Sequence, residues 1–143
     1  MAYCALNDIK KMIPETALIQ LTDDTGTGVA SQDAVNEAIA QADAEINAYC
    51  GAKYSVPFTT VPDVIRKASV DIAIYNLYSR RAEEIPQTRA DRYKNAVRLL
   101  ENISRGTISI GIDPEPAEKS EGASESNRPL CDRVFGRDRL KGF

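Results

Sequence analysis

The sequence contains one segment whose helical pattern is apolar on nearly every side. Between residues 63 and 81 apolar side chains occupy almost every position around the helical repeat, and Pro62 stands where a first helical turn would begin. A helix of this kind has neighbours on several faces and lies at the centre of a packed domain. The segment therefore predicts a mainly α fold organised around one central helix. Its apolar members are Val64, Ile65, Ala68, Val70, Ile72, Ala73, Ile74, Tyr75, Leu77 and Tyr78.

Two further segments have the periodicity of amphipathic helices. In residues 31–50 apolar side chains follow spacings of four, three, four and three, and abundant alanine gives a slim helix that neighbours can approach closely. A second stripe runs through residues 88–105 and ends at Gly106. Shorter helical turns precede both, near residues 7–13 and 14–21. We expect a small helical bundle of three substantial helices with short N-terminal turns.

A short β segment is expected after the last helix. Residues 107–112 alternate polar and β-branched apolar side chains, which is the pattern of an extended strand. Such a strand could add to the edge of a neighbouring chain. Packing of the same side chains on the chain's own helices is an equal alternative. The apolar residues concerned are Ile108, Ile110 and Ile112.

Charge is segregated along the chain, although the net charge is only −3. Residues 1–112 carry 12 Lys and Arg against 14 Asp and Glu, residues 113–125 carry one against five, and residues 126–143 carry five against two. Residues 113–127 contain no apolar side chain larger than alanine apart from proline, so they cannot bury enough surface to order themselves. We therefore expect a helical body over residues 1–112, a flexible acidic linker over residues 113–127 and an extended C-terminal arm over residues 128–143.

The arm over residues 128–143 has the composition of a docking segment. Apolar residues return there and alternate with basic ones. We expect the arm to insert into a groove of a partner protein or of an adjacent copy, where apolar anchors are buried and arginines meet acidic groups. The residues assigned to docking are Leu130, Arg133, Val134, Phe135, Arg137, Arg139, Leu140 and Phe143.

Residue types that carry much of enzyme chemistry are scarce. The chain has no histidine, and its three cysteines, Cys4, Cys50 and Cys131, have no CxxC spacing, so we expect free thiols and no zinc site. The triplet Asp24-Thr25-Gly26 lies in a turn between helical segments and not on a strand loop, so it does not indicate an aspartic protease. We expect no enzyme activity, no catalytic residue, no metal and no cofactor.

One carboxylate, Asp71, falls on the apolar stripe of the central helix. A catalytic acid is conceivable there, but it would need a partner base. A buried carboxylate is more commonly satisfied by a cation or a hydroxyl from another element. We interpret Asp71 as a structural buried carboxylate paired with an arginine or tyrosine of another helix.

The helix over residues 89–105 is rich in arginine and lysine, and a basic helix can follow the phosphates of DNA. Acidic residues are interleaved with the basic ones, which is typical of a solvated face. A small helical DNA-binding regulator that uses this helix is the alternative function for the chain.

Several phrases of the sequence together resemble one family nearly from end to end. They are DIKKMIPETALIQLTD, TDDTGTG, AVNEAIAQADAEINAYCGAKYSVP, VPDVIRKASVDIAIYNLY, RYKNAVRLLENISRGTISIGI and the closing RVFGRDRLKGF. The family that the chain resembles is the small neck protein of Mu-like phages and prophages. The likeness is weakest over residues 113–127.

The resemblance implies a head-completion or head-to-tail adaptor protein of the virion neck, made and assembled in the host cytoplasm. It implies a helical subunit that joins others in a ring, with about twelve copies if the ring matches a typical portal. The expected partners are the portal protein, copies of the chain itself, and the tail terminator or next neck protein below. Packaged DNA would pass nearby without sequence-specific contact, and no membrane is involved.

Overall fold

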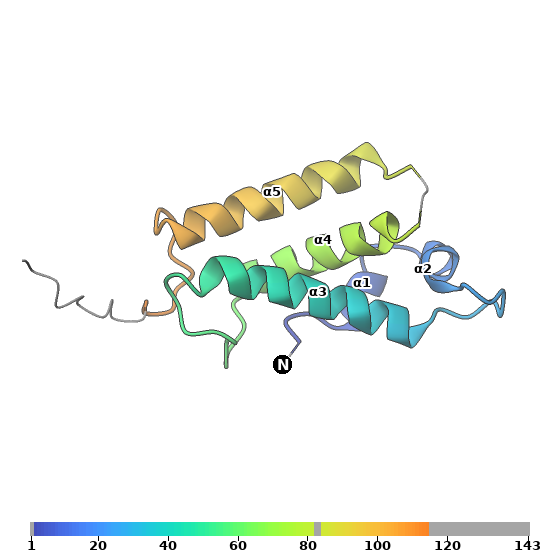
Figure 1. The fold of residues 1–143 in the computed structure, drawn as a ribbon, viewed down its shortest axis with the longest axis horizontal. Helices are drawn as coiled ribbons and strands as arrows, with labels where there is room; N and C mark the ends of the chain where they lie inside the picture. The colour runs from blue at the N-terminus through green and yellow to red at the C-terminus, as the bar shows by residue number, and fades with distance from the viewer. Residues whose placement is uncertain (1, 82–83, 115–143) are drawn as a thin grey trace, which may run out of the picture.

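A computed structural model describes residues 2–81 and 84–114 of the chain and contains five helices in that part (Figure 1). They are α1 (Leu6–Lys10), α2 (Glu15–Thr22), α3 (Gln32–Cys50), α4 (Asp63–Ser79) and α5 (Gln87–Ser104). The prediction of a mainly α bundle with three substantial helices and short N-terminal turns is confirmed. The acidic linker from residue 115 and the whole docking arm lie outside the described residues.

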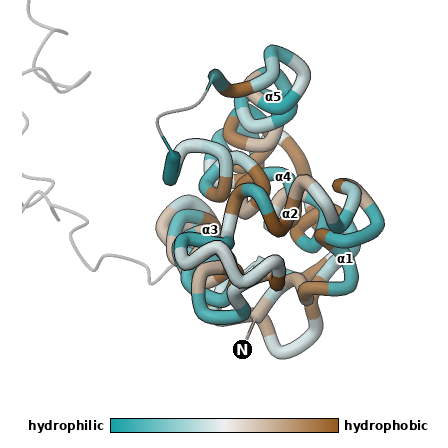
Figure 2. The backbone as a smooth tube through the Cα atoms, turned by 90° about the vertical axis from the view of Figure 1, so that its right-hand side faces the viewer, coloured by the Kyte–Doolittle hydropathy of each residue, from teal (hydrophilic) through white to brown (hydrophobic). Residues whose placement is uncertain are grey.

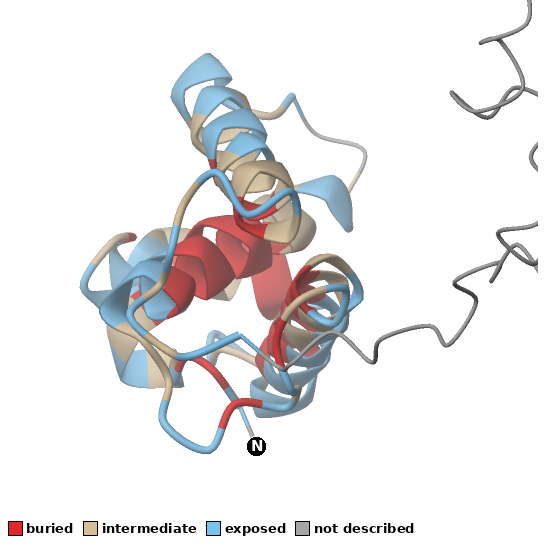
Figure 3. Cartoon of the chain, turned by 90° about the vertical axis from the view of Figure 1, so that its left-hand side faces the viewer, coloured by how far each residue is buried: buried red, intermediate tan, exposed pale blue. Residues whose placement is uncertain are grey.

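The helix α4 lies at the centre, as its all-round apolar pattern predicts. It contacts α3 and α5 along its length and also touches α1 and α2. Figure 3 shows the buried residues gathered between the helices, and Figure 2 shows hydrophilic positions on the outward turns of α3 and α5. Val64 is an exception among the expected core residues, with 42% of its surface exposed in the first turn of α4.

Proline and not a hydroxyl side chain stands at the start of the two C-terminal helices. Pro62 and Pro86 occupy the N-cap positions of α4 and α5 with extended backbone ψ values, and no side chain caps either helix. Proline presets the backbone there and lacks an N–H that would need a partner. In α3, by contrast, Ser31 caps the helix and its Oγ accepts a hydrogen bond from the Ala34 N–H at 3.4 Å.

The strand expected over residues 107–112 is wrong: no strand forms within residues 2–81 and 84–114. After the left-handed Gly106, the N–H groups of Thr107 and Ile108 donate to the Asn102 carbonyl oxygen, so the chain first closes the end of α5. A second left-handed glycine, Gly111, interrupts the extended course. The alternation has another origin, since Ile108, Ile110 and Ile112 are half-buried and pack against the helical core.

Candidate functional site

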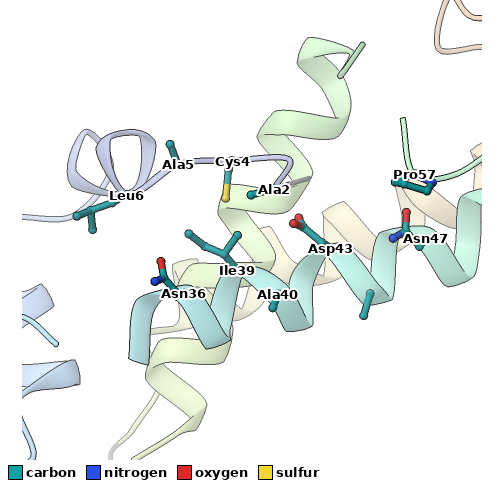
Figure 4. A pocket seen from close by; sticks show the side chains of 11 residues that line it. Ala2, Cys4, Ala5, Leu6, Asn36, Ile39, Ala40, Asp43, Asn47 and Pro57 are labelled. Carbon is teal, nitrogen blue, oxygen red and sulfur yellow. The ribbon is translucent and has the colours of Figure 1, made fainter. Parts of the chain in front are cut away.

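A groove of ≈ 710 Å³ runs between the N-terminal segment and α3 (Figure 4). One wall comes from the residues leading into α1, and the other comes from successive turns of α3. Most lining side chains are small or apolar, so backbone and side chains of a bound segment could approach closely. The lining residues are Ala2, Cys4, Ala5, Leu6, Asn36, Ile39, Ala40, Asp43, Ala44, Asn47 and Pro57.

Tyr3 fixes the N-terminal wall of the groove to α3. Only 2% of its surface is exposed, and its ring packs against Phe58 at a centroid distance of 5.6 Å. Its hydroxyl donates to Asn47 Oδ1 and accepts from the Phe58 N–H at 3.2 Å. Its backbone N–H donates to both carboxylate oxygens of Asp43, at 3.3 and 3.2 Å. The groove is therefore formed before anything binds in it.

Asp43 is the charged group inside the groove. Its Oδ1 also accepts a hydrogen bond from Ser69 Oγ at 3.1 Å. Burial raises the pKa of this carboxyl, while the hydrogen bonds from Tyr3 and Ser69 oppose the shift. No salt bridge to Asp43 occurs within residues 2–81 and 84–114. A carboxylate held in this way favours a cationic group entering the groove.

Cys4 also faces the groove, but it is poorly suited to nucleophilic chemistry. The residue is buried, and desolvation raises the pKa of its thiol. A thiol with a raised pKa stays protonated at neutral pH and reacts slowly. The arrangement therefore suits binding of a segment rather than covalent catalysis.

Asp71 is held by a partner from another helix. It is 7% exposed in α4, and Arg92 of α5 places its Nε 3.3 Å from Asp71 Oδ1. Next to this pair, the rings of Tyr75 and Tyr93 stack at 4.1 Å, and the Tyr93 hydroxyl donates to Glu45 Oε1 of α3 at 3.1 Å. These contacts connect the three long helices. Arg92 is the structural partner of Asp71.

The acidic turn over Thr22–Gly28 is anchored to the end of α4. Asp23 accepts hydrogen bonds from the N–H groups of Gly28, Thr27 and Thr25, which hold the pKa of its carboxyl at about 2. The Asp24 carboxylate pairs with both Arg80 and Arg81. Within the described part of the chain, no group of three or more His, Cys, Asp or Glu side chains is placed to hold a metal ion. The aspartates of this turn organise their own loop.

Comparison with known proteins identifies the family. A family model described as "Bacteriophage Mu, Gp36" matches residues 3–127. The chain belongs to the Bacteriophage Mu Gp36 family. It is 37% identical over 111 residues to the "Mu-like prophage FluMu protein gp36" of Haemophilus influenzae, covering 76% of this chain and 74% of the relative. It is 31% identical over 145 residues to "Gene product J" of Escherichia phage Mu, covering 100% of this chain and 99% of the relative. The family expected from the sequence phrases is confirmed.

Two arginines of the basic helix of this Gp36-family chain contact other elements of the protein. Arg89 donates to the Met12 carbonyl oxygen at 2.8 Å, and Arg92 pairs with Asp71. Arg105 makes only a surface pair with Glu101 at 3.9 Å, and 71% of its side chain is exposed. Lys94 and Arg98 are exposed. The array of basic side chains on α5 is thus smaller than the sequence suggests, which weakens the DNA-binding alternative.

Sequence reasoning did not find the groove of this Gp36-family member. The groove depends on Tyr3 meeting Asp43 and Asn47, pairs that lie 40 and 44 residues apart in the sequence. The signal that the sequence offered was Asp43 and Asn47, two polar residues four positions apart beside the apolar stripe of α3.

None of the helices in the described ranges is long and apolar enough to cross a membrane.

Proposed function

We propose that this chain is a structural protein of a phage particle, a head-tail connector subunit that forms a ring below the portal. The ring would extend the DNA channel and provide the attachment surface for the tail or for the next neck ring. Membership of the Mu Gp36 family supplies the phage context. The observation that carries the proposal is the preformed groove on a helical body whose sequence continues into a basic and apolar arm.

A groove and an arm are two different surfaces, and a ring requires two different surfaces on each copy. In a heterologous ring every subunit meets one neighbour with the first surface and the other neighbour with the second. Matching a typical portal gives about twelve copies.

The charge of the body suits a channel through which DNA moves. Residues 1–112 are close to neutral, and α3 carries four carboxylates and no basic residue. A strongly basic lining would hold the phosphates of DNA and impede passage. The mixed surface supports passage near packaged DNA without specific binding.

The arm over residues 128–143 is assigned to docking on the portal protein or an adjacent copy in the neck of the virion, and the tail terminator or next neck protein is the partner below. Assembly would take place in the host cytoplasm, with no catalytic step and no cofactor. The apolar anchors and arginines named from the sequence carry this contact.

A joining assay tests the function directly. Heads and tails from a phage lacking this chain are mixed with the purified protein, and infectious particles are counted. We expect joined particles only when the chain is added, and a chain ending at residue 127 should fail to join them while keeping the helical circular-dichroism signal. Joining that proceeds equally well without the chain would contradict the proposal, and steep salt-dependent binding to duplex DNA would then favour the regulator.

A further inference from the structure

The groove between the N-terminal segment and α3 has a charge opposite to that of the arm. Asp43 is the charged side chain among the residues that line the groove, and none of those residues is a lysine or an arginine. The helix α3 contains no lysine or arginine. Residues 126–143 carry five basic residues against two acidic ones. Charge complementarity of this kind steers two surfaces together and fixes their register.

We propose that this groove binds the arm, residues 128–143, of a second copy of the chain. The inference rests on the proposed function, because it takes the two copies to be neighbours in a ring. Apolar side chains of the arm lie on the alanine-rich floor, and an arginine of the arm pairs with Asp43.

The apolar part of the contact follows from the size of the lining side chains. Ala2, Ala5, Ala40 and Ala44 are exposed and leave space where larger residues would fill the groove. A volume of ≈ 710 Å³ lies within the range of about 300–1,000 Å³ that binding pockets occupy. The arm supplies Val134, Phe135, Leu140 and Phe143 to fill it.

Asp43 has hydrogen-bonding capacity left for the arm. A carboxylate offers about four lone-pair sites. The Tyr3 N–H and Ser69 Oγ use three of them through the contacts at 3.3, 3.2 and 3.1 Å. A guanidinium entering the groove would form a charge-assisted bond with the remaining site.

The chain outside the described residues is long enough to reach a neighbour. The last described residue is Pro114, shortly after the end of α5. Residues 115–127, which lie between Pro114 and the arm, can span at most about 45 Å when extended. This reach allows the arm to leave its own body and enter the groove of the next copy.

Disulfide trapping with the full chain tests the contact. Ala44→Cys places an exposed thiol in the groove, and the native Cys131 lies in the arm beside Leu130. Diamide oxidises the two thiols to a disulfide and is itself reduced to the hydrazine. We expect covalent dimers and longer ladders on non-reducing gels, and mass spectrometry should identify the peptide pair that joins the introduced thiol to Cys131. Raising the salt concentration should reduce the yield, since the pairing of charges is screened.

The matched control is Lys94→Cys, which places a thiol at another exposed position, on α5 and outside the lining of the groove. It should give only trace ladder under the same conditions, and Ala40→Trp added to Ala44→Cys should abolish the ladder by filling the groove. A disulfide within one chain would show the chain's own arm in the groove and would overturn the proposal, as would a ladder no stronger than that of the control. Particle joining without the chain, together with an intact ladder, would refute the proposed function and leave this contact standing.

Discussion

Replacing Tyr3 by phenylalanine removes the hydroxyl that links the N-terminal wall of the groove to the rest of the body. The Tyr3 ring is buried, and the hydrogen bond that its hydroxyl accepts from the Phe58 N–H is buried with it. The substitution breaks the bond to Asn47 Oδ1 and the bond from the Phe58 N–H at 3.2 Å, and leaves the Phe58 donor buried without a partner. Two neutral hydrogen bonds contribute about 1–3 kcal/mol together, and an unsatisfied buried donor costs a similar amount. We expect Tyr3→Phe to lower the free energy of unfolding by about 2 kcal/mol.

Urea unfolding followed by circular dichroism at 222 nm measures this change. A loss of about 2 kcal/mol lowers the midpoint of thermal unfolding by about 8 °C for a body of about 110 residues. Tyr78→Phe is the matched control, because Tyr78 is half-buried in α4 and its hydroxyl makes no hydrogen bond within the described residues. The control should stay within about 0.5 kcal/mol of the parent chain. An equally small change for Tyr3→Phe would refute the account of how the wall is held.

Three further predictions concern charges and thiols. Arg92→Met leaves the 7% exposed Asp71 without its cation, and because the Arg92 side chain is itself 40% exposed we expect a loss of about 1–2 kcal/mol in urea unfolding, recovered by adding Asp71→Leu. Backbone hydrogen bonds to the ionised Asp23 carboxylate lower its pKa from 3.8 to about 2 and stabilise the loop. This contribution is fully present at pH values above 3.8 and is lost as the pH falls towards about 2. The amide shift of Gly28 should therefore titrate with a midpoint near 2, and a midpoint near 4 would contradict the hydrogen-bonded turn. Burial raises the pKa of Cys50 to about 11 and that of Cys4 above its usual value, so at neutral pH iodoacetamide should label these thiols only in denaturant; rapid labelling of the folded chain would show that they are not buried.

Local periodicity was sufficient to predict the three long helices. The stripe through Val35, Ile39 and Ile46 is buried in α3, and the apolar run of α4 lies at the centre. Both patterns repeat with the period of the helix itself, so a single sequence reveals them. Cys4 and Cys50 are free, as expected from the odd number and wide spacing of the cysteines.

Residues 107–112 show where a local pattern misleads. Alternating apolar residues are typical of a strand, but the same alternation also arises when a chain crosses the end of a helix bundle. Ile108 and Ile110 pack against the core without forming a ladder. The two left-handed glycines, Gly106 and Gly111, are the signal in the sequence that the segment turns instead of extending.

The groove could not be predicted because distant pairs create it. Tyr3 must meet Asn47 and Phe58, and its N–H must meet Asp43, before the N-terminal segment becomes a wall. No spacing rule connects residues 40 or more positions apart. The alanines of α3 gave the correct general expectation of a slim helix that a neighbouring segment can approach closely.

Quantitative mass spectrometry of purified phage particles tests the central claim most directly, by comparing the copy number of this chain with that of the portal protein. A neck-ring subunit that matches the portal predicts nearly equal copy numbers, both in complete particles and in filled heads that carry the neck. Absence of the chain from purified particles would contradict its role as a head-tail connector.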